Sequence, residues 1–575
     1  MRAVLPDADT TNILVRPCPD PKFGDYQTNA LMAVAKERKM NPRQLATDVL
    51  AKLDVADVCE KVEIAGAGFL NFRVKNSAVI DSLAAAARGE HLFYQKTDKP
   101  RTAVVDFSSP NIAKPMHVGH IRSTILGDSL ARVLRLLGHR VVTDNHIGDW
   151  GTQFGKLLVG WKNHLDRAAL ELDAIGEMER LYKLINSTSE KDPAILEEAR
   201  RELVKLQAGD AENLEIWHEM IALSQHQFDT IYGRLGVKFD QVLGESFYNP
   251  WLKEVVEDLR AKNIARESDG ALCVFSDGSV PQKEDPFLIQ RDGKWQDNPA
   301  LIQKSDGGFN YATTDLATLQ YRLKTWQPSE IVYVTDGRQQ LHFQQLFSTF
   351  RRWHPEAKVK LAHVWFGSIL GEDGKPFKTR SGETVKLSDL LDEAEERAFK
   401  VVSDKNPEMP ESERKEIARI VGISAVKYAD LQPNRQSDYI FSWDKMLSLQ
   451  GNTAPYLLYA YTRVRSIFRK ADAGVQTPQN GSAGLVLSES DELTLAKHLL
   501  NFGLVLEAVI EDYRPNYLCT YLFELAGHFA RFYENCPVLK AEEPHRSSRL
   551  ALSDLTARVL KQGLEVLGIE TTEQM

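Results

Sequence analysis

The sequence predicts a multidomain chain that is α/β first and all-α at its end. At 575 residues it is longer than one hydrophobic core usually supports, about 250 residues. Residues 102–143 read as strand, loop, long helix and strand, the βαβ unit of a parallel sheet. From about residue 400 onward, apolar residues recur almost wholly at helical spacing. We therefore predict a small α/β domain at 1–90, a parallel-sheet domain at 100–400 and a helical bundle at 401–575.

The N-terminal segment combines short apolar runs with amphipathic stretches. Residues 62–65 and 69–72 have the composition of strands, whereas residues 30–37 have helical spacing. A last helix closes at residues 84–89, which end in glycine. These elements predict a compact α/β unit ahead of the central sheet.

The central domain begins with the βαβ unit and resumes after an insertion. Its first helix starts near Val118 and stops at Gly138, because glycine is common just past a helix end. Residues from about 160 to 300 are helical and charged and then turn-rich, which predicts an insertion between two parts of one sheet. The runs that predict the strands of this sheet are 103–107, 140–143, 331–334 and 363–366.

The composition excludes several classes of protein. No stretch of about 18 apolar residues is apparent and residues 1–21 lack the order of a secretory signal, so we expect no membrane contact and a cytoplasmic location. Five scattered cysteines, none spaced Cys-x-x-Cys, predict reduced thiols and no structural zinc. The net charge of −9 argues against a protein that coats nucleic acid uniformly, although it permits local basic patches.

A candidate phosphate-binding segment follows the first strand. Residues 108–120 read Ser-Ser-Pro-Asn-Ile-Ala-Lys-Pro-Met-His-Val-Gly-His and lead into a helix N-terminus, which favours phosphate. Gly119 allows close approach of a ligand to the backbone, and the flanking His117 and His120 can hydrogen-bond a triphosphate and stabilise charge on the leaving pyrophosphate. The four residues His-Val-Gly-His alone are equally compatible with a loop whose histidines satisfy local backbone groups.

Longer matches favour the functional interpretation. Residues 108–128 and 145–155 resemble two blocks of the arginyl-tRNA synthetases, class I aminoacyl-tRNA synthetases whose ATP signature is His-(small or apolar)-Gly-His. The resemblance covers nearly all of the chain. It implies a Rossmann-like catalytic domain, a helical anticodon-binding domain and an N-terminal domain that touches the tRNA elbow.

The second class I signature, Lys-Met-Ser-Lys, does not occur as such. Residues 371–382 instead read Gly-Glu-Asp-Gly-Lys-Pro-Phe-Lys-Thr-Arg-Ser-Gly, a degenerate form common among arginyl enzymes. The resemblance implies that Lys114 supplies the charge that this loop lacks, so we expect Lys114 and Lys378 to stabilise the transferring phosphates. Lys378 is alternatively a solvated loop charge. The residues expected at ATP are His117, Gly119, His120, Lys378, Thr379 and Arg380.

Arginine recognition requires carboxylates, because the planar N–H donors of a guanidinium pair bidentately with Asp or Glu. The resemblance assigns Asp106 to the α-ammonium, and it assigns Tyr311 and Asp315, four residues apart on one helical face, to the guanidinium. Without the resemblance, Asp315 reads as a carboxylate at a helix N-terminus. The residues expected at the amino acid are Asp106, Ser108, Asn111, Arg122, Tyr311, Asp315 and Gln345.

Residues 451–470 carry four basic residues and no acidic one. At helical spacing, Leu457, Tyr461, Val464 and Phe468 form a buried stripe, which leaves aromatic and cationic side chains on another face. Such a face suits unstacked bases, which contribute ~1–3 kcal/mol each on aromatic platforms. A tyrosine-rich helix is also compatible with a protein core. Guided by the resemblance, we expect Asn29, Asn452, Tyr456, Tyr459, Arg463 and Met575 to contact tRNA.

The implied reaction has two steps. The carboxylate of L-arginine attacks the α-phosphate of ATP, and a ribose hydroxyl of tRNA(Arg) then takes the arginyl group. We expect Mg²⁺ to arrive with ATP, no protein-bound metal, and a monomer. A class I enzyme for glutamate or glutamine is an alternative, but it would need cationic or amide groups in this pocket. An inactive tRNA-binding paralogue is another, against which the intact Lys114, His117 and His120 argue.

Overall fold

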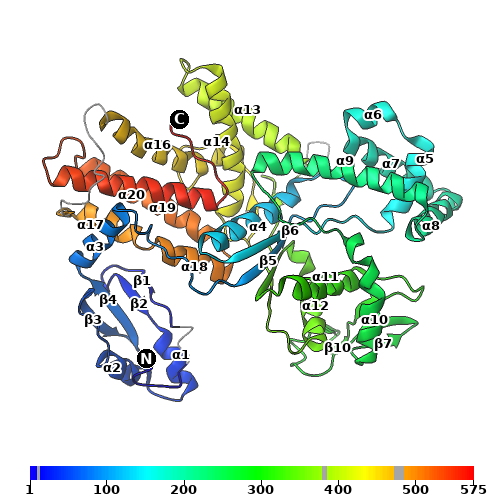
Figure 1. Cartoon of the computed structure of the whole chain (residues 1–575), viewed down its shortest axis with the longest axis horizontal. Helices are drawn as coiled ribbons and strands as arrows, with labels where there is room; N and C mark the ends of the chain where they lie inside the picture. Colours follow the sequence, from blue (N-terminus) through cyan, green and yellow to red (C-terminus); the bar gives the residue numbers. More distant parts are fainter. Residues whose placement is uncertain (9–12, 378–384, 472–484) are drawn as a thin grey trace.

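A computed structural model describes residues 1–8, 13–377, 385–471 and 485–575 (Figure 1). The N-terminal domain is a four-stranded antiparallel sheet in the order β1-β2-β4-β3, covered by two helices. Leu31, Ala35, Leu45 and Leu70 are buried between these layers. The strands and helix expected here are confirmed. Its elements are β1 (Arg16–Pro17), β2 (Tyr26–Thr28), α1 (Ala30–Glu37), α2 (Pro42–Leu50), β3 (Cys59–Ala65), β4 (Phe69–Val74) and the following α3 (Asn76–Ala87).

The central sheet is wholly parallel, in the order β13-β12-β5-β6. Its strands are β5 (Thr102–Phe107), β6 (Arg140–Asp144), β12 (Glu330–Val334) and β13 (Lys360–His363). The register aligns Tyr333, Asp106 and Asp144, so both carboxylates emerge side by side at the carboxyl edge of the sheet. Helix α4 (Val118–Leu136) packs on β5 so closely that a Cβ on Gly127 would lie 2.2 Å from Cγ of Phe107. The predicted βαβ unit is therefore confirmed.

One predicted strand is displaced. The run 363–366 was expected to be a strand, but β13 occupies Lys360–His363 and pairs with β12 along that length. Beyond His363, the N–H of Val364 still donates to the carbonyl of Tyr333 over 2.8 Å, and Phe366 forms an isolated bridge with Asp336. The side chains of Val364 and Phe366 are buried in the main hydrophobic core.

The insertion between β6 and α11 has two parts, as Figure 1 shows on its right-hand side. A helical part is followed by a mixed part built on a three-stranded antiparallel sheet, β11-β8-β7, and a separate β-hairpin. The helices of the first part are α5 (Gln153–His164), α6 (Arg167–Leu172), α7 (Ala174–Ser189), α8 (Pro193–Gln207) and α9 (Ala211–Leu235). The second part contains η1 (Glu245–Trp251), α10 (Leu252–Ala261), β7 (Ala265–Ser268), β8 (Ala271–Val274), β9 (Leu288–Arg291), β10 (Lys294–Asp297) and β11 (Ala300–Gln303).

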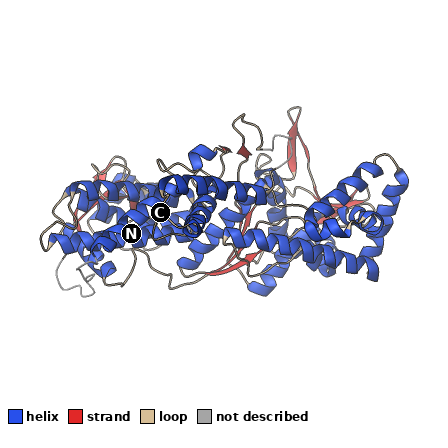
Figure 2. Cartoon of the chain, turned by 90° about the horizontal axis from the view of Figure 1, so that it is seen from above, coloured by secondary structure: helices blue, strands red, loops and turns tan. Residues whose placement is uncertain are grey.

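Two further helices return the chain to the sheet, and a helical bundle follows. Helices α11 (Tyr311–Trp326) and α12 (Gln340–Trp353) flank β12, with η2 (Gly337–Gln339) between. The bundle comprises α13 (Leu387–Lys405), α14 (Glu411–Leu431), α15 (Trp443–Met446), α16 (Ala454–Ala471), α17 (Ser490–Leu499), α18 (Phe502–Asp512), α19 (Asn516–Asn535) and α20 (His545–Val566). A short parallel pair, β14 (Ile369–Leu370) and β15 (Tyr439–Ile440), joins the two regions. Figure 2 shows that helices run along the whole length of the molecule.

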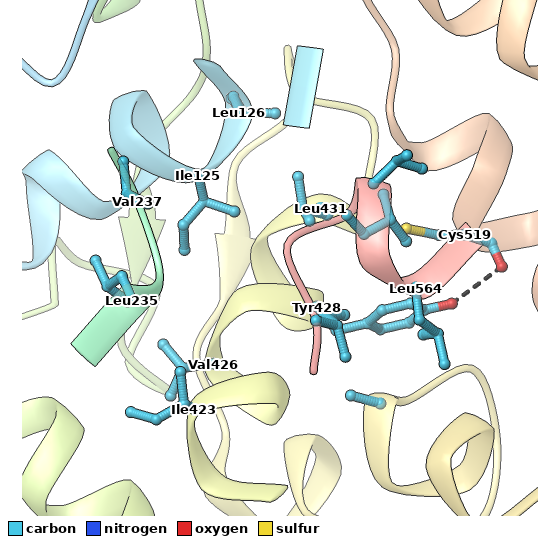
Figure 3. Packing of buried hydrophobic residues seen from close by; sticks show 14 of the residues in the cluster. Ile125, Leu126, Leu235, Val237, Ile423, Val426, Tyr428, Leu431, Cys519 and Leu564 are labelled. Atoms are coloured by element: carbon cyan, nitrogen blue, oxygen red, sulfur yellow. Dashed lines mark hydrogen bonds between the residues drawn. The ribbon is translucent and has the colours of Figure 1, made fainter. Parts of the chain in front are cut away.

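The bundle and the central domain share one hydrophobic core. Ile125 of α4 packs in the same cluster as Tyr428 of α14 and Leu564 of α20 (Figure 3). The hydroxyl of Tyr428 donates to the backbone carbonyl of Cys519 over 3.0 Å, so the buried phenol is not left without a partner. Helix α4, which begins at the signature histidines, is therefore packed directly against the C-terminal helices.

By length and mean hydropathy alone, Ser490–Asp512 passes the test for a membrane-spanning helix, although it contains charged residues. In the structure this segment is two helices, α17 and α18, which break at Leu500 and Asn501. Both pack against α19, and Leu495, Leu499 and Leu506 are fully buried. The apolar composition reflects packing inside the bundle.

Candidate active site

The two signature histidines fix the N-terminus of α4 and each other. His117 is the N-cap of the helix, and its Nδ1 accepts the backbone N–H of Gly119 over 3.0 Å. Nδ1 of His120 accepts the backbone N–H of His117, also over 3.0 Å. An imidazole nitrogen that accepts a hydrogen bond carries no proton, so in both neutral rings the proton lies on Nε2. Each ring therefore presents an N–H donor to a ligand at this helix end.

Both histidines are uncharged at neutral pH. Burial lowers the pKa of His120 to about 3. Burial also lowers the pKa of His117, and the nearby cations Arg338 and Lys114 lower it further. The rings therefore act on a triphosphate as neutral hydrogen-bond donors, while positive charge comes from the helix end and from neighbouring basic side chains.

The loop before α4 is held in an unusual backbone conformation. Ser108, Ser109 and Ala113 have φ of 74°, 49° and 60°, in the left-handed region that non-glycine residues rarely adopt. Asn145 accepts the N–H of Ser109 over 3.0 Å, and Ser224 of α9 accepts the N–H of Ala113 over 3.0 Å. Asn145, from the block at residues 145–155, thus helps to hold the phosphate-binding loop in place.

Asn111 is exposed and lies in the loop between β5 and α4, against Gly148 of the segment that follows β6. A Cβ on Gly148 would be 2.1 Å from Oδ1 of Asn111, so a larger residue there would displace the Asn111 side chain. Asn111 and Gly148 also form a parallel bridge. This contact holds the Asn111 side chain beside the site and leaves it exposed.

Asp106 belongs to a buried charge network. The fully buried Arg322 of α11 contacts Oδ2 of Asp106 over 2.6 Å and Oδ2 of Asp144 over 2.7 Å. Burial raises the pKa of Asp144 although Arg322 opposes the shift. The other oxygen of Asp106 receives the hydroxyl of Ser109 over 3.1 Å. The network fixes Asp106 at the strand end and leaves Oδ1 on the side of the loop.

A second group of acidic residues lines the site from the insertion and α11. Oδ2 of Asp315 lies 2.6 Å from Nε2 of His342, and the ring of Tyr311 packs against that imidazole. Glu245 opens η1, and burial raises its pKa to about 7, with Asp315 and Asp149 adding to the rise. The predicted pair Tyr311 and Asp315 does lie on one helix, as expected.

Glu245, His342 and Arg338 were missed by the sequence analysis. Glu245 follows Gly244, where a Cβ would lie 2.2 Å from Oδ2 of Asp149, a close approach that only the fold reveals. Arg338 follows the carboxyl end of β12, pairs with Asp336 over 2.8 Å and is 90% exposed. A position just after a parallel strand is where ligands usually bind, and this signal was available.

Three residues predicted to contact arginine also have partners within the protein. Arg122 is 1% exposed and pairs with Asp430 of α14 over 2.8 Å. The Ser108 hydroxyl is buried and lies 2.8 Å from the hydroxyl of Tyr232. Nε2 of Gln345 donates to two backbone carbonyls of the insertion, those of Pro286 and Asn298. These internal bonds hold each side chain in place, and their contacts with arginine stay a prediction.

Of the basic residues predicted to contact phosphate, only Lys114 lies in the described part of the chain. Lys114 is exposed, and its Nζ lies 5.7 Å from the ring centre of Tyr182 on α7. Lys378, Thr379 and Arg380 lie outside the described residues. In the part of the chain that the structure describes, no group of three or more His, Cys, Asp or Glu side chains is arranged to hold a metal ion.

Helix α16 has the two faces expected of it. Leu457, Tyr461, Val464 and Phe468 are buried in one stripe. On the other face, Tyr459 is 46% exposed and the guanidinium of Arg463 lies 5.3 Å from the ring centre of Tyr533. Tyr456 is half-buried against Phe523. This gives an aromatic and cationic surface of the kind that binds unpaired bases.

The other residues predicted to contact RNA differ in how much of each side chain is engaged by the protein. Asn29 is exposed at the N-terminus of α1, makes no side-chain cap and lines a cavity of about 530 Å³ beside α18. Oδ1 of Asn452 lies 2.5 Å from the hydroxyl of Tyr428, so half of its amide faces the protein. Met575 packs on the main core beside α16, where Glu573 bonds Tyr461 over 2.8 Å.

The sequence matches three family models. Residues 83–443 match the class I tRNA synthetase (R) catalytic domain, residues 2–74 the arginyl-tRNA synthetase N-terminal domain, and residues 457–575 the DALR anticodon-binding domain. The chain belongs to the arginyl-tRNA synthetases. The catalytic model extends beyond the boundary that we predict at residue 400, and the domain limits stay a prediction.

Relatives in this family are similar over their whole length. The arginine–tRNA ligase of Hahella chejuensis is 48% identical over 98% of this chain and 96% of its own. That of Synechococcus elongatus is 47% identical, with 99% and 96% covered. The arginyl-tRNA synthetase structure from Plasmodium falciparum has a TM-score of 0.79 at 29% identity, covering 100% of this chain and 97% of that one. The Thermus thermophilus enzyme has a TM-score of 0.82 at 24% identity, with 100% and 98% covered, and shows the same fold.

Proposed function

We propose that this chain is an arginine–tRNA ligase that joins L-arginine to the 3′-terminal ribose of tRNA(Arg) at the expense of ATP. In the first step the arginine carboxylate attacks the α-phosphate, which gives arginyl-adenylate and pyrophosphate. In the second step a ribose hydroxyl attacks the activated carbonyl and AMP leaves. The observation that carries the proposal is a cluster of acidic side chains beside a helix N-terminus with two N–H-donating histidines.

ATP binds at the N-terminus of α4 in this proposal. The Nε2–H groups of His117 and His120 donate to phosphate oxygens, and Lys114 adds charge from the preceding loop. Mg²⁺ enters as part of the ATP substrate, held by phosphates and water, because the nearest buried carboxylates, Asp106 and Asp144, already pair with Arg322. Neither step needs a covalent bond to the enzyme, so positioning and charge stabilisation carry the catalysis.

Arginine binds with its two ends at different carboxylates. Asp315, with Tyr311 beside it, takes the guanidinium, and Oδ1 of Asp106 and Asn111 take the ammonium and carboxylate ends. Glu245 adds negative charge between them. The side chain of a glutamate substrate would be repelled by Asp315 and Glu245, because like charges at short range repel, and the neutral amide of glutamine would form no ion pair with them.

The tRNA is read at two separated surfaces. The α16 face with Tyr456, Tyr459 and Arg463 binds anticodon bases, and the α1 end with Asn29 binds the elbow. We further propose that the enzyme works as a monomer in the cytoplasm, where both its ATP and its tRNA are found.

Charging of purified total tRNA tests the proposal directly. The enzyme is incubated with ATP, Mg²⁺, total tRNA and each labelled amino acid in turn, and labelled tRNA is collected. Only arginine should be incorporated, with pyrophosphate released. A His120→Asn variant is a matched control, since it keeps an acceptor for the His117 N–H and loses the Nε2–H donor. Incorporation of another amino acid, or of none, would overturn the proposal.

A further inference from the structure

His342 makes the closest contact to the carboxylate that we assign to the guanidinium. Its Nε2 lies 2.6 Å from Oδ2 of Asp315, and the two side chains are only 15% and 21% exposed. A carboxylate can only accept, so Nε2 carries the proton and donates it. A hydrogen bond from a ring to an ionised group is short and strong, and it restricts rotation of the carboxylate.

The imidazole is itself held on both sides. The ring of Tyr311 packs edge-on at 4.8 Å between centroids, and Phe343 of the next position packs at 5.2 Å. Phe343 stacks on His363 at 4.4 Å, and Nε2 of His363 lies 2.8 Å from Oγ1 of Thr335, at the end of β12. The position of His342 is thus tied to the carboxyl edge of the central sheet.

The second carboxylate oxygen of Asp315, Oδ1, takes no part in this bond. Among the described residues no side chain or backbone group bonds to its Oδ1, and Oδ2 keeps a second lone pair. A guanidinium presents two parallel N–H donors in one plane, so it pairs best with a carboxylate whose plane is fixed. The ammonium of lysine is not planar, so it does not require a carboxylate with a fixed plane.

We propose that His342 is a positioning residue for arginine: by holding Oδ2 of Asp315 it fixes the carboxylate plane that the guanidinium recognises. The inference rests on the proposed function. It assigns His342 to the amino-acid half of the reaction alone, because nothing links it to the phosphate-binding helix end.

Paired substitutions test the role. His342→Leu removes the donor, and His342→Gln keeps an amide N–H in nearly the same place. In tRNA charging, we expect His342→Leu to raise the arginine KM roughly 10- to 100-fold, the factor that corresponds to losing one hydrogen bond to a charged group. The ATP KM should stay within about twofold, and His342→Gln should recover most of the arginine affinity. Thermal melting confirms that each variant is folded.

His354→Leu is the matched control. His354 ends the same helix, and its Nδ1 lies 3.3 Å from Glu356, away from the carboxylate cluster. It should leave the arginine KM unchanged. If wild type charges arginine but His342→Leu behaves like His354→Leu, or His342→Gln is no better than His342→Leu, the inference is wrong while the proposed function stands. If wild type charges a different amino acid, the proposed function fails first.

Discussion

At the scale of single residues, one kind of side chain serves several purposes in this site because its partners differ. Asp106 and Asp144 share the buried Arg322, so their charge is compensated within the protein. Asp315 is bound by an imidazole. Glu245 has no cation bonded to it in the described structure, and burial raises its pKa to about 7. Glu245 is therefore the acidic group whose charge depends on conditions near neutral pH.

This dependence predicts the pH profile of arginine binding. Below pH 7, Glu245 is mostly protonated, and a cationic substrate must expel that proton to gain the ion pair. We expect the arginine KM to rise as the pH falls from 8 to 6, by at most about tenfold per unit. Glu245→Gln should have a higher KM at pH 8 and a flatter profile, measured in tRNA charging at pH 6, 7 and 8. Parallel profiles would assign the pH effect to another group.

The histidine pair predicts a different outcome. His120→Asn keeps an oxygen that can accept the N–H of His117 and removes the Nε2–H donor. We expect the turnover number for arginine-dependent, tRNA-supported pyrophosphate exchange to fall about 10²- to 10³-fold, as for other lost transition-state donors. The arginine KM should stay the same. Because burial lowers the pKa of His120 to about 3, its loss should not change the pH profile between 6 and 8. An arginine KM that rises as turnover falls would contradict this role.

At the scale of elements, the sequence predicted those parts whose pattern is local. Period-2 and period-3.6 runs located β5, α4 and β6 correctly, and the buried stripe of α16 followed from helical spacing alone. The strand at 363–366 was displaced because its limits depend on pairing with β12, which lies some thirty residues earlier. The local pattern of apolar residues does not specify which residues of a strand pair with the neighbouring strand of the sheet.

The same distinction explains the site. The histidines and Asp315 lie in continuous motifs and were found. The internal partners of Arg122 and Gln345, which are Asp430 and the carbonyls of Pro286 and Asn298, lie far away in sequence, so the motifs did not predict them. Glu245 and His342 were missed for the same reason, since their environment comes from elements that only the fold brings together.

A buried lysine where several elements meet gives a prediction at this scale. Lys427 of α14 is 1% exposed, and its Nζ donates to the carbonyls of Leu235, at the end of α9, and Gly568, just after α20. Burial lowers the pKa of Lys427 to about 8, below its usual value of 10.5. Above pH 8 the folded protein releases a proton that the unfolded chain keeps. The contribution of Lys427 to stability therefore increases with pH between 8 and 10.5 and has no slope below 8.

Lys427→Met isolates this contribution. The thermal midpoint of wild type should rise relative to that of the variant as the pH increases from 8 to 10, and the difference should be constant between pH 6.5 and 7.5. Other groups that titrate in this range, including buried tyrosines, are present in both proteins and cancel in the difference. If the thermal midpoint of wild type instead fell relative to that of the variant as the pH rises, the sign would be wrong for a buried ammonium.

At the scale of the whole molecule, the N-terminal domain and the C-terminal helices lie together at one end and the insertion at the other (Figure 1). Lys497 of α17 bonds Asp25 over 2.8 Å, and Arg16 pairs with Glu511 of α18 on the surface. These contacts connect the two domains to which we assign tRNA binding. The net charge of −9 means that RNA meets an acidic body, so attraction has to come from local surfaces such as that of α16.

That surface predicts two separable effects on tRNA. Tyr459→Ala removes an exposed ring, and Arg463→Ala removes a cation beside Tyr533. Each should raise the tRNA KM about 5- to 100-fold, the factor that ~1–3 kcal/mol per contact corresponds to, and leave the KM for arginine and ATP unchanged. Arg463→Ala should also reduce the slope of log affinity against log salt by about 0.7 to 1, whereas Tyr459→Ala should not.

Leu172→Ala is the control for these variants, because Leu172 is 90% exposed on the insertion at the opposite end of the molecule. It should change neither the tRNA KM nor its salt dependence. Equal salt slopes for wild type and Arg463→Ala would mean that no phosphate meets this guanidinium. An unchanged tRNA KM in both Tyr459→Ala and Arg463→Ala would show that the anticodon binds another face, since an exposed ring that stacks on a base cannot be removed without loss of affinity.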